Sequence, residues 1–105
     1  MIKRFDLYGW QSLLPSEAAK RLAALPGVVL QLHDSSYRGG EYYRGGSDSA
    51  EELIVQHNFR DEDGHLAEPE FPDYKTIVYV TWGSDGNVDP IREIRDLTLL
   101  RTELL

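Results

Sequence analysis

The sequence contains no cysteine among its 105 residues, and this absence excludes several classes of protein. Disulfide bonds, thiolate nucleophiles and cysteine-ligated zinc all require that side chain. The sequence also lacks an apolar run of the about 18 to 20 residues that a membrane-spanning helix needs. Its first residues, Met1 to Asp6, lack the apolar region of a signal peptide. We therefore expect a cytoplasmic protein.

Motifs that bind cofactors or metals are also missing. The sequence contains no P-loop, and no G-x-G-x-x-G segment follows a predicted strand. Asp61, Asp63 and Glu68 are oxygen ligands of the kind that calcium prefers, yet an EF-hand loop requires glycine at its sixth position and glutamate at its twelfth. Counted from Asp61, those positions hold Leu66 and Pro72. We therefore expect no cofactor and no dedicated metal site.

The chain does contain enough apolar sequence for one hydrophobic core. Hydrophobic residues make up 41% of its 105 residues. This length is typical of a single soluble domain, which usually has about 100 to 150 residues. We expect one domain over residues 1–105, without a second lobe that would form an interdomain substrate cleft.

Negative charge is abundant and unevenly distributed. Eighteen acidic and eleven basic residues give a formal net charge of −7. The segment 61–73 carries six carboxylates and no lysine or arginine. Nucleic acids and anionic membranes are bound through lysine and arginine, so the sequence disfavours both as partners. The acidic segment instead predicts attraction of a basic protein, although a solvated loop that maintains solubility explains the same composition.

Five segments have the composition of β-strands. They are residues 2–8, 28–33, 37–44, 52–59 and 76–82. Most show alternating apolar side chains, and the segment 37–44 is rich in tyrosine, with Gly39 and Gly40 indicating a bulge. Residues 76–82 are apolar or aromatic on both faces, which predicts a strand in the centre of the sheet.

Two further segments predict helices. Pro15 suits a first helical turn, and the apolar residues after it follow helical spacing until the pair Pro26–Gly27 ends the helix. A second helix is predicted to begin with Asp89 as its N-cap and Pro90 at its first position, and to continue to Leu104. Its expected buried stripe consists of Ile91, Ile94, Leu97, Leu100 or Thr98, and Leu104.

The resulting order, β-α-β-β-β-β-α, indicates an α+β domain. Successive strands joined by short turns favour a mostly antiparallel sheet. We expect a two-layer sandwich in which two helices cover one face of a sheet of four to five strands.

Tyrosine and arginine gather in the segment 37–44. Both residue types are enriched at the centres of protein–protein interfaces. Such residues can also stack on bases and hold phosphates, but two arginines within an acidic domain make a weak nucleic-acid footprint. Cross-strand packing of the aromatic side chains is an alternative interpretation.

The histidines offer an enzymatic alternative. His57 lies between apolar residues on a predicted strand, and His33 precedes Asp34 at the end of another. Isolated histidines in such positions are more often structural residues with one hydrogen-bond partner. No nucleophile-elbow motif accompanies them, so we assign no catalytic residue. The role of His65, within the acidic segment, is left open.

Two segments carry a resemblance to a known class of proteins. They are Asp34-Ser35-Ser36-Tyr37-Arg38-Gly39-Gly40-Glu41-Tyr42-Tyr43-Arg44 and Glu68-Pro69-Glu70-Phe71-Pro72-Asp73-Tyr74. With its small size, acidity and α+β order, the chain resembles small acidic bacterial immunity proteins, which neutralise toxins of polymorphic or contact-dependent inhibition systems. The resemblance implies a non-enzymatic inhibitor that binds and occludes one toxin domain. A nuclease toxin, whose active site holds phosphate, would suit an acidic inhibitor.

We therefore predict a protein-binding site made of aromatic, basic and acidic side chains. Its candidate residues are Tyr37, Arg38, Tyr42, Tyr43, Arg44, Asp61, Glu62, Asp63, Glu68, Glu70 and Asp73. Two alternatives stay open. One is a small enzyme or metabolite-binding domain that uses His57 or His33, and the other is a structural subunit that self-associates through Val78 to Trp82.

Overall fold

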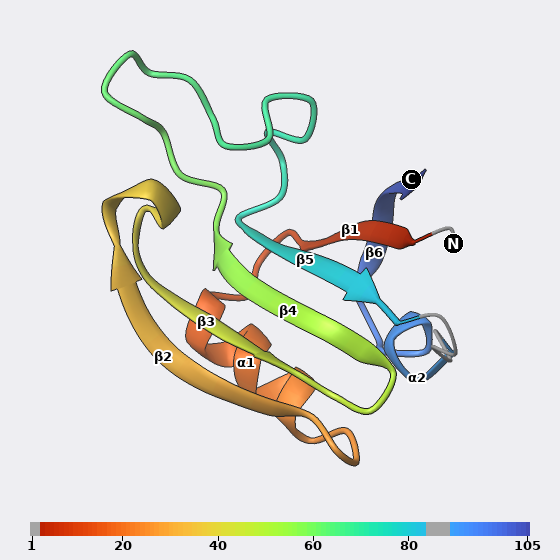
Figure 1. Ribbon diagram of the computed structural model, residues 1–105. Helices are drawn as coiled ribbons and strands as arrows, with labels where there is room; N and C mark the ends of the chain where they lie inside the picture. The colour runs from red at the N-terminus through yellow and green to blue at the C-terminus, as the bar shows by residue number, and fades with distance from the viewer. Residues whose placement is uncertain (1–2, 84–88) are drawn as a thin grey trace.

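The computed structural model describes residues 3–83 and 89–105, and the chain forms a six-stranded sheet with helices beside it (Figure 1). The strands are β1 (Arg4–Trp10), β2 (Val29–Ser35), β3 (Gly40–Gly46), β4 (Ala50–His57), β5 (Thr76–Trp82) and β6 (Thr98–Leu104). The helices are α1 (Pro15–Ala23), α2 (Asp89–Arg92) and the 3-10 helix η1 (Ser36–Arg38). No helix of the described residues is long and apolar enough to cross a bilayer. The predicted α+β class is confirmed.

Every strand of the sheet pairs antiparallel with its neighbours, in the order β2-β3-β4-β5-β1-β6. The strands from β2 to β5 follow one another across the sheet in chain order. Strand β1 then lies between β5 and β6, so segments from opposite ends of the sequence pair with each other. Lys3 and Leu105 extend this pairing by exchanging main-chain hydrogen bonds of 2.7 and 2.9 Å. The arrangement leaves β2 and β6 as the two edges.

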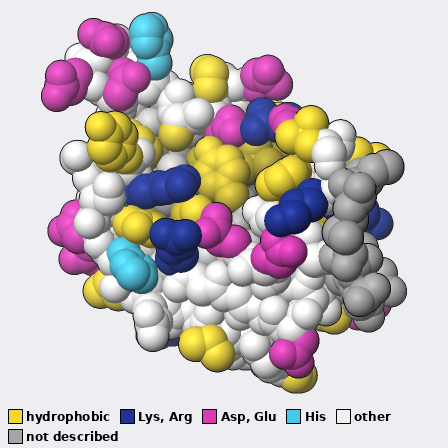
Figure 2. Space-filling model, viewed as in Figure 1, with side chains coloured by type: hydrophobic (Ala, Val, Ile, Leu, Met, Phe, Trp, Pro, Cys, Tyr) yellow, Lys and Arg dark blue, Asp and Glu magenta, His cyan; other side chains and the backbone are white. Residues whose placement is uncertain are grey.

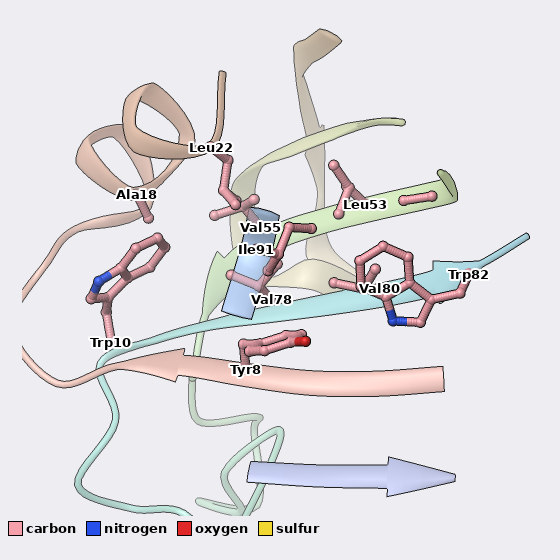
Figure 3. Packing of buried hydrophobic residues seen from close by; sticks show 11 residues of the cluster. Tyr8, Trp10, Ala18, Leu22, Leu53, Val55, Val78, Val80, Trp82 and Ile91 are labelled. Atoms are coloured by element: carbon pink, nitrogen blue, oxygen red, sulfur yellow. The ribbon is translucent and has the colours of Figure 1, made fainter. Parts of the chain in front are cut away.

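The hydrophobic core lies on the face of the sheet that α1 covers (Figure 3). Trp10, Val55 and Val78 extend from three neighbouring strands toward the helix. There they join Ala18 and Leu22 of α1, and none of these five side chains is more than 1% exposed. Burial of one large apolar side chain contributes about 1.5 to 3 kcal/mol, so this cluster holds the helix on the sheet.

Helix α1 begins at the predicted residue. Pro15 occupies the first helical position, where its missing N–H would have no helical partner. The carboxylate of Glu17 accepts a hydrogen bond from Leu14 N at 3.0 Å and so satisfies one of the free donors at this end. The helix ends before Pro26, as the sequence predicts.

The predicted second helix is wrong beyond its first turn. Helix α2 ends at Arg92, and residues 98–104 form β6, so the sheet has six strands instead of four to five. Asp96 has a φ of 66°, a left-handed conformation that a continuing helix cannot contain. Ile91 of the shortened helix still packs in the core cluster with α1. The predicted capping by the Asp89 side chain lies outside the described part of the structure.

The predicted strand at 37–44 is divided by its two glycines. Gly39 and Gly40 have φ angles of 79° and 107°, so they form a turn between η1 and β3 instead of the expected bulge. The other predicted strands are present with shifted ends. Residues 76–82 form β5 as predicted, in the interior of the sheet between β4 and β1.

The connection between β4 and β5, residues 58–75, forms a long loop that is fastened to itself. The side chain of Asn58 accepts a hydrogen bond from Glu68 N and donates one to Phe71 O, both at 2.9 Å. The outer part of the loop projects beyond the end of the sheet (Figure 1). This projection carries the first acidic residues of the segment 61–73.

Candidate functional site

The turn after β2 and the tip of the 58–75 loop enclose an open groove of about 750 Å³, which we call the turn–loop groove. Its lining residues are Asp34, Ser36, Tyr37, Gly39, Gly40, Phe59, Arg60, Asp61, Glu62 and Asp63. Tyr37 comes from the tyrosine-rich segment and Asp61 to Asp63 from the acidic segment. The fold therefore places parts of both predicted segments on one surface.

Gly39 allows the turn and the loop to lie close together. Its φ of 79° is in the left-handed region that favours glycine. A Cβ atom at this position would also lie only 2.5 Å from Cγ of Phe59. The aromatic ring of Phe59 can therefore pack directly against the turn, which holds the loop beside η1.

The tip of the loop is a hydrogen-bonded turn. Asp61 N donates to His65 O at 2.9 Å, and Gly64 N donates to Asp61 O at 3.0 Å. Oδ1 of Asp61 also accepts hydrogen bonds from the main-chain N–H groups of Asp63 and His65, each at 2.9 Å. Arg60 Nη1 donates to Gly64 O at 2.8 Å. These bonds fix the backbone that presents the acidic side chains.

The charge around the groove is predominantly negative. The carboxylates of Asp34, Asp61, Glu62 and Asp63 line it together with one guanidinium, that of Arg60. Figure 2 shows the acidic side chains gathered at the tip of the loop, at the upper left of the molecule. Carboxylates grouped in this way create a local potential that attracts lysine and arginine side chains.

Tyr37 is the exposed aromatic residue of the groove, with 91% of its surface accessible to solvent. The turn that presents it is capped, because Ser35 Oγ accepts a hydrogen bond from Tyr37 N at 3.3 Å. A tyrosine ring beside carboxylates offers a cation two kinds of favourable contact, one with the ring face and one with the charged oxygens.

Arg38 and Tyr42 contact other parts of this chain on the sheet face opposite α1. Arg38 Nη1 donates to Gln56 Oε1 at 3.0 Å. Its guanidinium carbon lies 5.8 Å from the ring centroid of Tyr79 and 6.0 Å from that of Tyr42. The ring of Tyr42 stacks on His33 with a centroid distance of 5.5 Å. These two predicted site residues thus stabilise the sheet surface next to η1.

Four other predicted residues lie outside the groove. Tyr43 packs against the hydrophobic core on the α1 side of the sheet. Arg44 forms an exposed ion pair with Glu52, with 2.6 Å between Nη2 and Oε2. Glu70 and Asp73 are exposed on the later part of the loop. The structure therefore divides the predicted residues among several surfaces.

Glu68 is buried, with only 8% of its surface exposed. Its Oε1 accepts a hydrogen bond of 2.7 Å from Arg101 Nη2 and one of 3.3 Å from the hydroxyl of Tyr79. Burial, together with the neighbouring Glu68 carboxylate, raises the pKa of Tyr79 to about 12. The hydrogen bond from Arg101 to Glu68 likewise raises the pKa of Arg101. Glu68 therefore fastens the loop to β5 and β6.

Asp6 is a second buried carboxylate, which the sequence analysis missed. Its oxygens accept hydrogen bonds from Trp82 Nε1 and Thr102 Oγ1 at 2.8 Å, from Arg4 Nε at 3.0 Å and from the Tyr8 hydroxyl at 3.2 Å. Burial alone raises the pKa of Asp6, but the hydrogen bonds from Arg4, Trp82 and Thr102 and the charge of Arg4 outweigh burial and lower it. The cluster joins β1, β5 and β6, so its role is structural.

The histidines of the enzymatic alternative do not share a site. His57 is half-buried and lines an open cavity of about 500 Å³ with Asp73, Tyr74 and Lys75 among its other walls. His33 is exposed on β2, an edge of the sheet. This arrangement provides no pair of imidazoles for acid–base chemistry.

The acidic residues considered for calcium are also separated. Asp61, Asp63 and His65 have possible ligand atoms within 4.8 Å of one another, and all three side chains are exposed. Glu68 instead binds Arg101. Because Asp61 already accepts main-chain hydrogen bonds, we assign no metal to this cluster.

The surface considered for self-association is not accessible in the folded chain. Val78, Val80 and Trp82 are each at most 2% exposed. They belong to β5, which β4 and β1 flank on both sides. A second copy cannot bind to these side chains without unfolding the core.

The resemblance to immunity proteins is a separate question from the geometry of the groove. The structure describes a fixed acidic turn beside an exposed tyrosine, but geometry alone does not assign a family. Comparison of the chain with protein-family models, with curated proteins and with solved structures finds no match.

Proposed function

We propose that this chain is a non-enzymatic protein-binding module that captures a basic protein domain in the turn–loop groove. The supporting observation is that exposed Tyr37 lies beside the carboxylates of Asp61, Glu62 and Asp63 in one groove. In its most concrete form, the module is an immunity protein that acts in the cytoplasm of a bacterium and blocks a toxin by covering its active surface.

Electrostatic attraction would guide the first encounter. The chain has a net charge of −7, and the projecting loop carries a concentrated part of it. Complementary charge can raise association rates well above those of neutral protein pairs, and salt reduces the effect. A toxin that acts on nucleic acid needs lysine and arginine to hold phosphate. The acidic groove would therefore be attracted to the surface that the toxin uses for its substrate.

Close contacts would then hold the partner in place. A lysine or arginine side chain of the partner would stack on Tyr37 and form ion pairs with Glu62 or Asp63. Desolvated tyrosine anchors in protein interfaces often contribute about 2 kcal/mol or more when truncated. The ion pair between Glu68 and Arg101 supports this role indirectly, because it fastens the loop to the sheet before any partner binds.

Measurement of binding kinetics tests the groove directly. The partner is first isolated from the source cells on immobilised chain and identified by mass spectrometry, with a basic domain as the expected result. In the double variant Glu62→Gln/Asp63→Asn, we expect slower association at low salt, because two of the attracting charges are removed. In Tyr37→Ala, we expect at least about a tenfold faster dissociation, because an anchor is lost.

The matched control removes the same two charges elsewhere. Asp48 and Glu93 are exposed and do not line the groove. Asp48→Asn/Glu93→Gln should slow association much less than the groove variant does. Equal effects of the two double variants would show that overall charge, and not the groove, attracts the partner. Unchanged dissociation of Tyr37→Ala would exclude the tyrosine as an anchor.

A further inference from the structure

Strand β2 forms an exposed edge of the sheet. It is outermost in the strand order, pairs with β3, and runs along the outer side of the molecule in Figure 1. In an antiparallel pair, alternate residues direct their main-chain N–H and C=O groups toward the partner strand, so the other residues of β2 direct theirs outward. Such a row of groups can pair with a strand of another chain.

The edge of β2 lacks the usual features that prevent such pairing. Residues 29–35 contain no proline, lysine or arginine, and they pair with β3 in one uninterrupted register. The opposite edge differs, because β6 carries Arg101 and Glu103 and its pairing with β1 is interrupted by a register shift. Charges and bulges of this kind discourage strand addition.

Apolar side chains on β2 are also unusually exposed. Val29 is 62% exposed and Leu32 is 56% exposed. Leu30, on the same face of the strand as Leu32, packs only partly against the core. A partner strand that placed apolar residues opposite these side chains would remove them from water.

We propose that β2 pairs antiparallel with β2 of a second copy of this chain, about a two-fold axis at Gln31, so that two six-stranded sheets join into one. A two-fold axis is the commonest symmetry of soluble dimers. An axis at this edge keeps α1 of both copies on the same side of the joined sheet. The interface is independent of the partner proposed for the turn–loop groove.

The side chains of β2 favour this register over its neighbours. With Gln31 on the axis, Leu30 of each copy lies opposite Leu32 of the other, so four leucines cluster on one face. Moving the axis to Leu32 would place Leu30 opposite Asp34, and moving it to His33 would place Leu32 opposite Asp34. Both shifts oppose an apolar side chain to a carboxylate, which the Gln31 register avoids.

Sedimentation velocity over a wide micromolar concentration range tests the dimer. We expect the wild-type chain to approach twice its mass of 12.0 kDa. Leu32→Lys should be monomeric, because two ammonium groups would face the leucine cluster. The matched control is Leu104→Lys on the β6 edge, where the leucine is 63% exposed, and this variant should dimerise like the wild type.

The alternative outcomes are clear. A wild-type chain that stays monomeric at every concentration overturns the proposal. Dimers of Leu32→Lys, or loss of dimers in Leu104→Lys alone, would also overturn it. Thermal melting of both variants confirms that each is folded, because both leucines are exposed and their replacement leaves the core intact.

Cross-linking then tests the register, since the chain has no cysteine of its own. Directly opposed residues in an antiparallel pair have Cα atoms about 4.5 to 5.5 Å apart, within the range of a disulfide. Gln31→Cys should therefore form a disulfide-linked dimer under mild oxidation. The two copies of Val29→Cys would lie about 13 Å apart along the strands and should not link. Linking of Val29→Cys but not Gln31→Cys would contradict the proposed axis.

Discussion

Asp6 and Glu68 are buried carboxylates on opposite faces of the sheet, and each is stabilised by an arginine and by hydroxyl or indole donors. Removing one partner from such a cluster leaves buried polar groups without hydrogen bonds, which is more costly than the net contribution of the bond itself. Neither residue has the exposure needed to contact a partner protein. Their effect on function therefore operates through the position of the strands and the loop.

Asp6 makes the stability of the fold sensitive to acid. Its pKa is lower in the folded chain than its ordinary value of 3.8, so its contribution is present above about pH 4 and is lost as the pH falls through the folded-state pKa. Asp6→Asn should lower the free energy of unfolding by about 1 to 3 kcal/mol at neutral pH. Urea denaturation at several pH values would measure this change.

The same measurement contains its own check. Asp6→Asn should lose less stability than the wild type between pH 5 and pH 2, values that span the pKa range of carboxylates, about 2 to 5. Asp73→Asn, which changes an exposed carboxylate, should follow the wild-type profile. An unchanged acid dependence in Asp6→Asn would mean that other groups cause the acid sensitivity.

At the level of the strands, the pairing of β2 with β3 depends on Gly45. This residue lies opposite Leu30, and a Cβ atom added to it would collide with the main-chain oxygen of Val29. The obstacle is backbone and cannot be removed by a change of side-chain rotamer. The close approach of the two strands therefore requires glycine at this position.

Gly45→Ala should separate the two strands locally and lower the free energy of unfolding by about 1 to 3 kcal/mol, the usual range for backbone strain. Gly83→Ala is the control, because its added Cβ would lie an ordinary 3.5 Å from Ser49 O. That variant should stay within about 0.5 kcal/mol of the wild type. Chemical denaturation of both variants decides the matter, and equal stability would contradict the collision.

At the scale of the whole molecule, β6 connects the two faces of the sheet with the beginning of the described chain. Thr102 binds Asp6 on one face, and Arg101 binds Glu68 on the other. Strand β6 also covers the outer edge of β1. The acidic loop and the core strand β1 therefore both depend on residues near position 100.

Deletion of residues 98–105 should abolish cooperative thermal unfolding, because it removes a strand and leaves two buried carboxylates without donors. Circular dichroism on heating would show a broad, shallow change in place of a sharp transition. Deletion of Leu105 alone, which removes only the terminal main-chain pair with Lys3, should retain the sharp transition. A sharp transition at the wild-type temperature in the longer deletion would contradict this role of β6.

Local patterns were sufficient to predict α1 and β5. Pro15 marks the start of the helix, and the apolar residues of 76–82 identify an interior strand whatever the rest of the chain does. The segment after Pro90 was interpreted wrongly because its isoleucines and leucines fit a helical period over a short distance. The free edge of β1 made the strand more favourable there, and no local pattern records that edge.

The candidate site shows the same division. The exposed Tyr37 and the acidic tip residues could be proposed from composition, but Glu68 could not be separated from them without its contact to Arg101. Gly39 was noticed as a glycine, while its function of admitting the ring of Phe59 depends on a residue from another strand connection. Composition therefore suggested the kind of surface, and the contacts identified which residues form it.

The absence of cysteine, the charge of −7 and the positions of α1 and β5 follow from residue types and short-range spacing, which do not depend on distant partners. The strand β6, the burial of Asp6 and Glu68 and the turn–loop groove depend on contacts between segments far apart in the chain. Hydrogen bonds and burial at those contacts exist only after folding. For that reason they outweigh local preference where the two disagree.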